Sequence, residues 1–268
     1  MRTNGQPRLT KAILEDRYAL FNRRKFVHPD PLEFLYCYRD AGDREIVGML
    51  SSSLAYGRVQ QILKSVSTVL GRMAGPPHEF LMQTPESDFD RIFEGIKHRF
   101  TDAAQISALM RGMRRLIREH GSLNNAFLAG HPADAGTVLQ AMDRFSAALD
   151  LPDSYLVPAP SSGSACKRFC LYLRWMVRKD HVDPGGWKGV SPAQLIVPVD
   201  THMAGIAREF GLTSKKSANR AMAEEITRAF AAFCPEDPVR YDFALTRFGI
   251  HPEVKKLRGN MAKQEEPA

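Results

Sequence analysis

The sequence predicts an all-α protein, and three observations carry this prediction. Apolar residues recur with the period of an α-helix along most of the chain, no segment alternates apolar and polar residues between hairpin turns, and several segments begin or end at capping residues. In chain order, this pattern places helices at residues 8–23, 30–38, 43–55, 58–73, 77–83, 102–120, 136–149, 164–179, 200–210, 216–233 and 237–248.

Local signals mark the ends of several of these helices. Asp30-Pro31 and Asp237-Pro238 each offer an N-cap followed by proline at the first helical position, where the missing N–H of proline is not needed. Gly121 and Gly211 stand where helices commonly end in a left-handed residue. The polar residues that follow the last helix, 259–268 above all, are predicted to fray.

The predicted helix at 102–120 has one apolar face and one basic face. Its four arginines are Arg111, Arg114, Arg115 and Arg118. They either follow a phosphate backbone or form a solvated face that pairs with acids such as Glu119.

Length and composition are those of a soluble globular protein. The chain has 268 residues, 44% hydrophobic and 25% charged, which suffices for one large domain or two lobes. No apolar run is long enough to cross a bilayer and the first residues lack a secretory apolar core, so we expect a cytoplasmic protein without a membrane partner. The cysteines form no disulfide or zinc pattern and are expected to be reduced; they are Cys37, Cys166, Cys170 and Cys234.

The charge balance suggests a polyanionic partner. The net charge is +7, and the 28 residues from Ser161 to Lys188 hold six basic and two acidic residues, a local net charge of +4. We interpret this concentration as contact with a nucleic-acid backbone around one lysine, Lys167.

Lys167 follows a small-residue turn, PSSGSACK, that leads into the predicted helix at 164–179. Free backbone N–H groups at such a turn, around Ser162, Gly163 and Ser164, could hold a phosphate beside Lys167 and Arg168. A lysine amine there could act as a nucleophile. The alternative is an ordinary surface lysine.

Asp200 lies in the segment VPVDTHM, at the start of the predicted helix at 200–210. It can cap that helix, and its carboxylate could also stabilise positive charge developing on a sugar C1′ carbon. His202, two residues later, either contacts a ligand or is a structural hydrogen-bond partner.

The turn that ends in Lys167 and the segment that carries Asp200 together resemble the helix-hairpin-helix DNA glycosylases, particularly the 8-oxoguanine DNA glycosylases. The segment MLSSSLAYGRVQQILKSV is similar to the helix and turn that those enzymes insert into DNA, and GIKHRF to a turn before a long helix. The resemblance implies that Tyr56, Arg58 and Arg99 contact DNA. Stretches such as SGSACKR, SLAYGR and DPVRYDFAL most closely match a family catalogued only as a domain of unknown function.

This resemblance implies a two-lobed helix-hairpin-helix DNA glycosylase-like fold with a cleft between the lobes. Residues 41–160 would form a central helical lobe, and residues 1–40 together with 161–258 a second lobe that carries the hairpin. The turn departs from the PGVGxK pattern of the superfamily, and no four-cysteine loop is present, so no iron–sulfur cluster is expected. Trp187, in the long segment between Lys167 and Asp200, either stacks on a base or fills a packing gap.

The function implied is a base-excision glycosylase that removes a damaged base, 8-oxoguanine-like, from duplex DNA as a monomer. Lys167 would attack C1′ and Asp200 would stabilise the cationic transition state, and the resulting Schiff base would permit AP-lyase cleavage without a metal or cofactor.

Two alternatives remain. The first is a DNA-binding or damage-recognition protein on the same scaffold that does not cut DNA. The second is a metal-dependent hydrolase that uses His181, Asp183, Asp200 and His202, although their spacing matches no common ligand motif.

Overall fold

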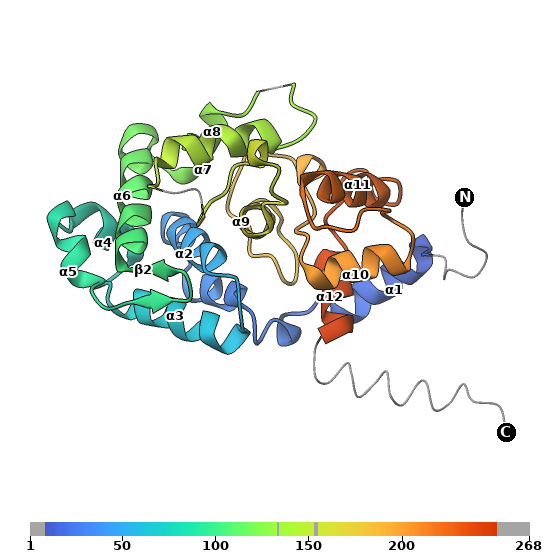
Figure 1. Ribbon diagram of the computed structural model, residues 1–268, viewed down its shortest axis with the longest axis horizontal. Helices are drawn as coiled ribbons and strands as arrows, with labels where there is room; N and C mark the ends of the chain where they lie inside the picture. Colours follow the sequence, from blue (N-terminus) through green and yellow to red (C-terminus); the bar gives the residue numbers. More distant parts are fainter. Residues whose placement is uncertain (1–8, 133, 153–154, 251–268) are drawn as a thin grey trace.

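The computed structural model describes residues 9–132, 134–152 and 155–250 (Figure 1). In these residues the protein is predominantly helical, with one antiparallel pair of two-residue strands, which confirms the predicted all-α class. The α-helices are α1 Lys11–Phe21, α2 Ala41–Ser53, α3 Val59–Gly71, α4 Pro77–Gln83, α5 Phe89–Ile92, α6 Ala103–His120, α7 Leu123–Ala129, α8 Leu139–Leu149, α9 Lys167–Val177, α10 Thr201–Glu209, α11 Arg220–Ala231 and α12 Asp242–Ile250. The strands are β1 Lys97–His98 and β2 Thr101–Asp102.

Helix ends match the sequence prediction best where a cap is local. The side chain of Asp102 accepts a hydrogen bond from the Gln105 N–H, and the Gln105 Oε1 accepts one from the Asp102 N–H. This capping box starts α6 one residue from the predicted position. Gly121, with φ of 82°, ends α6 in the left-handed region as predicted.

Two predicted segments differ in the structure. Asp30 does cap the segment that follows, but Pro31–Cys37 is a 3-10 helix. The prediction that Asp237 caps the last helix is wrong, because its carboxylate instead accepts hydrogen bonds from Arg178, and α12 begins five residues later at Asp242. A partner distant in sequence thus outweighed the local capping signal.

Helix α9 lies between two groups of helices (Figure 1). Helices α2 to α8 lie on one side of α9, and α1, α10, α11 and α12 on the other. α9 packs against α2, and α12 packs against both α1 and α10. The side chains of Tyr172 and Trp175 in α9 are fully buried, so this helix forms the centre of the hydrophobic core.

Buried ion pairs fasten the C-terminal half of α9 to the segments around it. Arg174 pairs with Asp183 and Asp242, while Arg178 pairs with Asp180, Asp183 and Asp237. Both arginines are only 3% exposed. This network fixes α12 and the loop after α9 relative to the first turn of α9, where Lys167 lies.

Candidate functional site

A cavity of about 430 Å³ lies where several segments distant in sequence meet, and both predicted catalytic residues line it. Its volume lies within the range of about 300–1,000 Å³ common for small-molecule sites. The residues that matter most here are Lys167, Asp200, Asp30, Arg247, Ile62 and Leu171. The structure therefore brings Lys167 and Asp200, 33 positions apart in sequence, to one site.

Lys167 is the first residue of α9, and its environment explains how a cation is held at a positive helix end. The preceding residue, Cys166, has a left-handed backbone with φ of 47°, and no side chain caps the helix. The Nζ of Lys167 donates a hydrogen bond to the Ala55 carbonyl oxygen at 3.2 Å, just past the C-terminal end of α2. The negative end of the α2 dipole thus offsets the unfavourable end of α9.

Cys166, next to Lys167, is unsuited to act as a nucleophile. The thiol is buried, and burial raises its pKa to about 11, so the protonated form dominates at neutral pH. Its Sγ donates to the Pro158 carbonyl at 3.1 Å. Cys166 therefore acts structurally, by holding the strained turn before Lys167.

Asp200 caps α10, as predicted. Its Oδ1 accepts hydrogen bonds from the backbone N–H groups of His202 and Met203, both at 2.9 Å. Among the described residues no donor bonds to the second oxygen, Oδ2, and no ion pair links Asp200 to Lys167 or to another cation. The exposed side chain of His202 also lines the cavity. One carboxylate oxygen therefore remains available to a ligand.

The turn before α9 is less open than the sequence suggests. Ser162 and Gly163 are exposed, but their N–H groups donate to the carbonyls of Ala159 and Pro160. The N–H of Ser161 donates to the Asp143 carboxylate at 2.8 Å, which places a negative charge beneath the turn, and Ser164 forms an isolated bridge with Asn219. The prediction that these N–H groups are free to hold a phosphate is thus wrong for Ser162 and Gly163.

Arg168 is held between two aromatic rings and is not a free cation. Its guanidinium lies 4.9 Å from the Tyr56 ring centre and 4.7 Å from that of Tyr155. It also donates to the carbonyls of Ser53 and Tyr155. Arg168 therefore fixes the start of α9 against the end of α2.

Tyr56 supports a hairpin and does not project from the surface. Its hydroxyl lies 2.7 Å from both the His98 carbonyl oxygen and the Thr101 Oγ1, so it closes the β1–β2 hairpin. The residues at the hairpin tip are Arg99, with φ of 52°, and Phe100, which is 71% exposed. Sequence reasoning missed Phe100, because a single aromatic residue has no periodicity that marks it as exposed.

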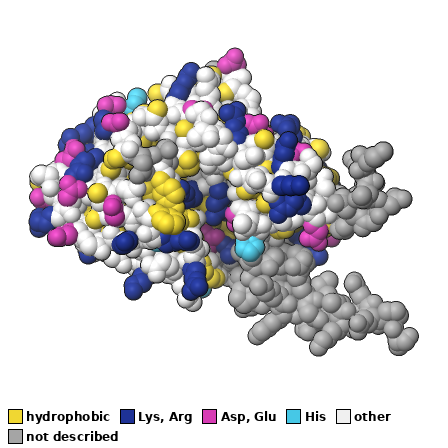
Figure 2. Space-filling view, viewed as in Figure 1, with side chains coloured by type: hydrophobic (Ala, Val, Ile, Leu, Met, Phe, Trp, Pro, Cys, Tyr) yellow, Lys and Arg dark blue, Asp and Glu magenta, His cyan; other side chains and the backbone are white. Residues whose placement is uncertain are grey.

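Exposed cationic side chains lie beside this hairpin. Arg58 and Arg99 are both exposed, and the Arg99 side chain lies across Gly57, a residue of the cavity wall with φ of 94°. Phe100 contacts Tyr155 edge to face, with ring centres 6.1 Å apart. On the face of the molecule seen in Figure 2, a hydrophobic patch lies near the middle, with Lys and Arg side chains beside it.

Several predicted DNA contacts serve packing instead. Trp187 is 6% exposed and packs against Phe127 and Tyr172. It therefore fills a gap in the core, which favours the packing alternative over stacking on a base. The interpretation of residues 161–188 as a basic DNA-contacting surface is wrong for Arg174 and Arg178, whose charges are neutralised in the buried network.

Three of the four arginines of α6 also have internal partners. Arg111 pairs with Asp90, Arg114 donates to the carbonyls of Met82 and Thr84, and Arg115 donates to the Ala148 carbonyl. These contacts favour the reading of α6 as a brace between neighbouring helices over a phosphate-tracking surface.

The four residues of the metal-hydrolase alternative are not gathered. Asp183 is fully buried in ion pairs with Arg174 and Arg178, whereas Asp200 caps α10 at the cavity. Across the described ranges, no three His, Cys, Asp or Glu side chains are grouped so that they could hold a metal ion.

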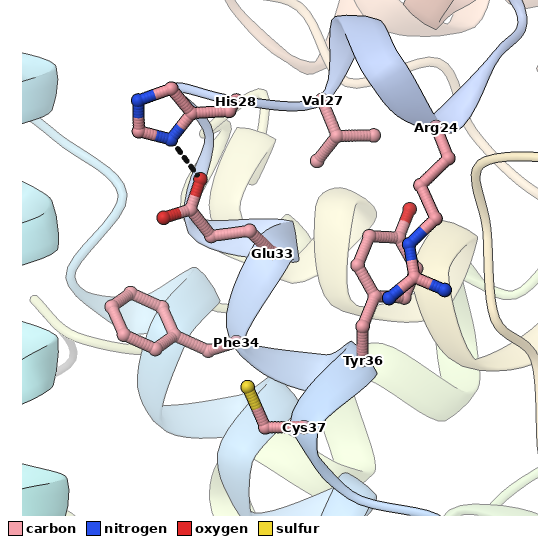
Figure 3. Close-up of a pocket in the computed structure, with 7 residues that line it drawn as sticks. All are labelled: Arg24, Val27, His28, Glu33, Phe34, Tyr36 and Cys37. Atoms are coloured by element: carbon pink, nitrogen blue, oxygen red, sulfur yellow. Dashed lines mark hydrogen bonds and ion pairs between the residues drawn. The ribbon is translucent and has the colours of Figure 1, made fainter.

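A second cavity, of about 410 Å³, is formed by a single short segment, residues 24–37 (Figure 3). The His28 ring points to the Glu33 carboxylate at 2.8 Å, and the Arg24 guanidinium lies 3.9 Å from the centre of the Tyr36 ring. None of the predicted site residues lines it.

The geometry defines a helical protein with a lysine and a carboxylate on one cavity. The chain belongs to the family described as protein of unknown function (DUF2400), whose model matches residues 30–251. No curated protein and no solved structure matches the chain. In the part of the chain that the structure describes, no helix has the length and hydropathy needed to cross a membrane.

Proposed function

We propose that this protein is a base-excision DNA glycosylase with AP-lyase activity that acts on duplex DNA. The observation that carries the proposal is the placement of Lys167 and Asp200 on one cavity, each at the start of a helix. No ion pair joins them among the described residues, so a substrate group can lie between an amine and a carboxylate.

The two side chains suit the two demands of glycosidic bond cleavage. The Lys167 amine, once deprotonated, attacks C1′, and the bonding electrons of the C1′–N bond leave with the base. The free Oδ2 of Asp200 stabilises the positive charge that develops on the sugar. Cleavage of the C1′–O4′ bond, with a proton taken up by O4′, then gives a Schiff base between Lys167 and C1′. Loss of a C2′ proton to water breaks the 3′ C–O bond, and the 3′ phosphate leaves.

The surface beside the cavity suits a distorted duplex. Phe100 is an exposed ring that can fill the gap left by an extruded nucleotide, and Arg58 and Arg99 can contact the phosphates on either side. We also propose that the two helix groups around α9 form the two lobes of a helix-hairpin-helix glycosylase-like fold, with the boundaries predicted from the sequence.

A second candidate is a protein that recognises damaged DNA without cutting it. It is favoured by the hydrogen bond from Lys167 to the Ala55 carbonyl, which stabilises a charged lysine suited to binding phosphate. Affinity for DNA does not separate the two candidates, because both predict salt-dependent binding.

Covalent trapping separates them. Wild-type protein incubated with an abasic-site duplex and borohydride is expected to give a reduced protein–DNA adduct and, without borohydride, strand cleavage. Lys167→Gln should abolish both, whereas Lys179→Gln, an exposed lysine just past the end of α9, should retain both. Absence of the wild-type adduct would favour the binding-only candidate.

Asp200→Asn tests the carboxylate without removing the helix cap, because asparagine caps as well as aspartate. Base excision should fall by at least about 10²-fold, as for loss of one transition-state charge partner, with the melting temperature unchanged. Unchanged excision would remove Asp200 from the mechanism.

A further inference from the structure

Arg247, on α12, is a buried cation on the wall of the same cavity, and the proposed chemistry leaves it without a role. It is 6% exposed, and its guanidinium lies 4.9 Å from the centre of the Phe243 ring. Among the described residues only the Asp30 carboxylate accepts a hydrogen bond from it, and the Nε atom is buried with no partner. A guanidinium has five N–H donors, so most donors of Arg247 have no acceptor among the described residues.

The neighbouring wall is apolar. Ile62 and Leu171 line the cavity together with two prolines, Pro29 and Pro31, that flank Asp30. Asp30 is fixed in turn, because it also caps the 3-10 helix that follows by accepting from the Leu32 N–H at 2.9 Å. A flat ring with hydrogen-bond acceptors on its edge fits an apolar wall with one oriented donor group.

We infer that Arg247 reads the extruded base by donating hydrogen bonds to a keto oxygen on its edge, with Asp30 orienting the guanidinium. The inference rests on the proposed glycosylase function and names the chemical class of base. Arginine donates and never accepts, so it pairs with the O6 keto oxygen of guanine-type bases and opposes the 6-amino group of adenine-type bases. The oxygen read is O6 of a purine or O4 of a pyrimidine, and we call a base that carries it a keto base; 8-oxoadenine has an amino group at that position.

The test compares bases that differ at this edge. Single-turnover excision is measured on duplexes that contain 8-oxoguanine, 8-oxoadenine, hypoxanthine or uracil, with trapping on an abasic-site duplex as the reference. Wild type should excise at least one keto base about tenfold or more faster than 8-oxoadenine. Preference for hypoxanthine and 8-oxoguanine over uracil assigns the cavity to purines, and the reverse to pyrimidines.

Variants separate base reading from folding. Arg247→Met should slow excision of the preferred keto base at least about tenfold, yet still trap abasic DNA, which has no base for Arg247 to contact. Asp30→Asn retains the cap to Leu32 and should show the same pattern more weakly. Thermal melting of each variant shows whether it is folded.

Three results would overturn the inference while the proposed function stands. They are excision of the keto base by Arg247→Met at the wild-type rate, equal losses on base-bearing and abasic DNA, and a wild-type enzyme that traps abasic DNA but prefers 8-oxoadenine or excises no keto base. Failure of the proposed function looks different, because wild type then forms no adduct with abasic DNA, and the inference falls with it.

Discussion

The turn Ala165-Cys166-Lys167 shows how single side chains define the candidate site. Cys166 takes a left-handed conformation that costs about 1–2 kcal/mol for a residue other than glycine. Its buried thiol and the bond from Lys167 to Ala55 hold this strain in place. The strain lies beside the residue that the proposed chemistry needs, as is common at functional sites.

Native thiol labelling tests the description of Cys166. Cys37 is exposed, whereas the other three cysteines are buried and their thiol pKa values are raised by burial. Iodoacetamide at pH 8 should therefore modify Cys37 alone until denaturant is added, as measured by peptide mass spectrometry. Modification of Cys166 as fast as Cys37 would show an accessible thiolate and a possible second nucleophile.

The prediction that Lys167 and Asp200 each lie at a helix start is confirmed, because each start has a local sequence signal. The sequence could not reveal Arg247, whose partner Asp30 is 217 positions away. The sequence also assigned Arg174 and Arg178 to a DNA-contacting surface. A sequence does not show whether water or a buried carboxylate surrounds a basic residue.

Among the elements, the β1–β2 hairpin depends on a neutral histidine. His98 is fully buried, its Nε2 donates to the Tyr56 carbonyl at 3.0 Å, and its Nδ1 accepts from the Ser65 hydroxyl at 2.9 Å. Burial lowers the pKa of His98 below its ordinary value of 6.5.

This lowered pKa predicts acid sensitivity. Below about pH 6.5 the unfolded chain binds a proton that folded His98 resists, so stability is lost as pH falls, by about 1.4 kcal/mol for each unit by which the pKa is lowered. Between pH 7 and 5 the melting temperature of wild type should fall more steeply than that of His98→Gln. The control His181→Gln, at an exposed side chain, should follow wild type. Parallel curves for wild type and His98→Gln would contradict the prediction.

The hairpin tip is expected to contact DNA through Phe100. Stacking of an aromatic side chain on a base contributes about 1–3 kcal/mol, so Phe100→Ala should weaken binding to an abasic-site duplex about five- to a hundredfold. Leu20→Ala removes an apolar side chain that is 50% exposed on α1 and should have little effect. Equal affinities of Phe100→Ala and wild type, in titrations at fixed salt, would exclude the ring as a contact.

The helices predicted from sequence agree with the structure where the start signal is local, such as the proline at the start of α4 and the capping box of α6. Helix α7 is not predicted from the sequence although Ser122 caps it; it is as short as α4 but lacks the proline that marks the start of α4. Helix α12 begins later than predicted because Asp237 forms an ion pair with Arg178 and does not cap the helix.

At the scale of the whole molecule, several basic side chains are internal. Buried pairs join α9 to α12 and to the loop after α9, and only exposed cations such as Arg58 and Arg99 remain to meet a polyanion. The buried network holds two arginines and four aspartates, a net charge of −2, so the rest of the chain carries +9 and the basic excess lies outside the network.

The buried network should also dominate global stability. Arg174→Met leaves Asp183 and Asp242 buried without this partner, which should lower the free energy of unfolding by about 3–5 kcal/mol. Arg111→Met, which breaks a more exposed pair with Asp90, should cost less than about 1 kcal/mol. Denaturant titrations of both variants measure the difference, and equal losses would show that the buried network is not the main fastening.

The most direct test of the proposed chemistry is to locate the trapped nucleophile in the wild-type chain. After borohydride reduction with an abasic-site duplex, nuclease and protease digestion followed by mass spectrometry should find the deoxyribose remnant on the peptide that contains Lys167. A remnant on another lysine, or on the N-terminal amine, would contradict the assignment of Lys167 as the nucleophile and of its cavity as the active site.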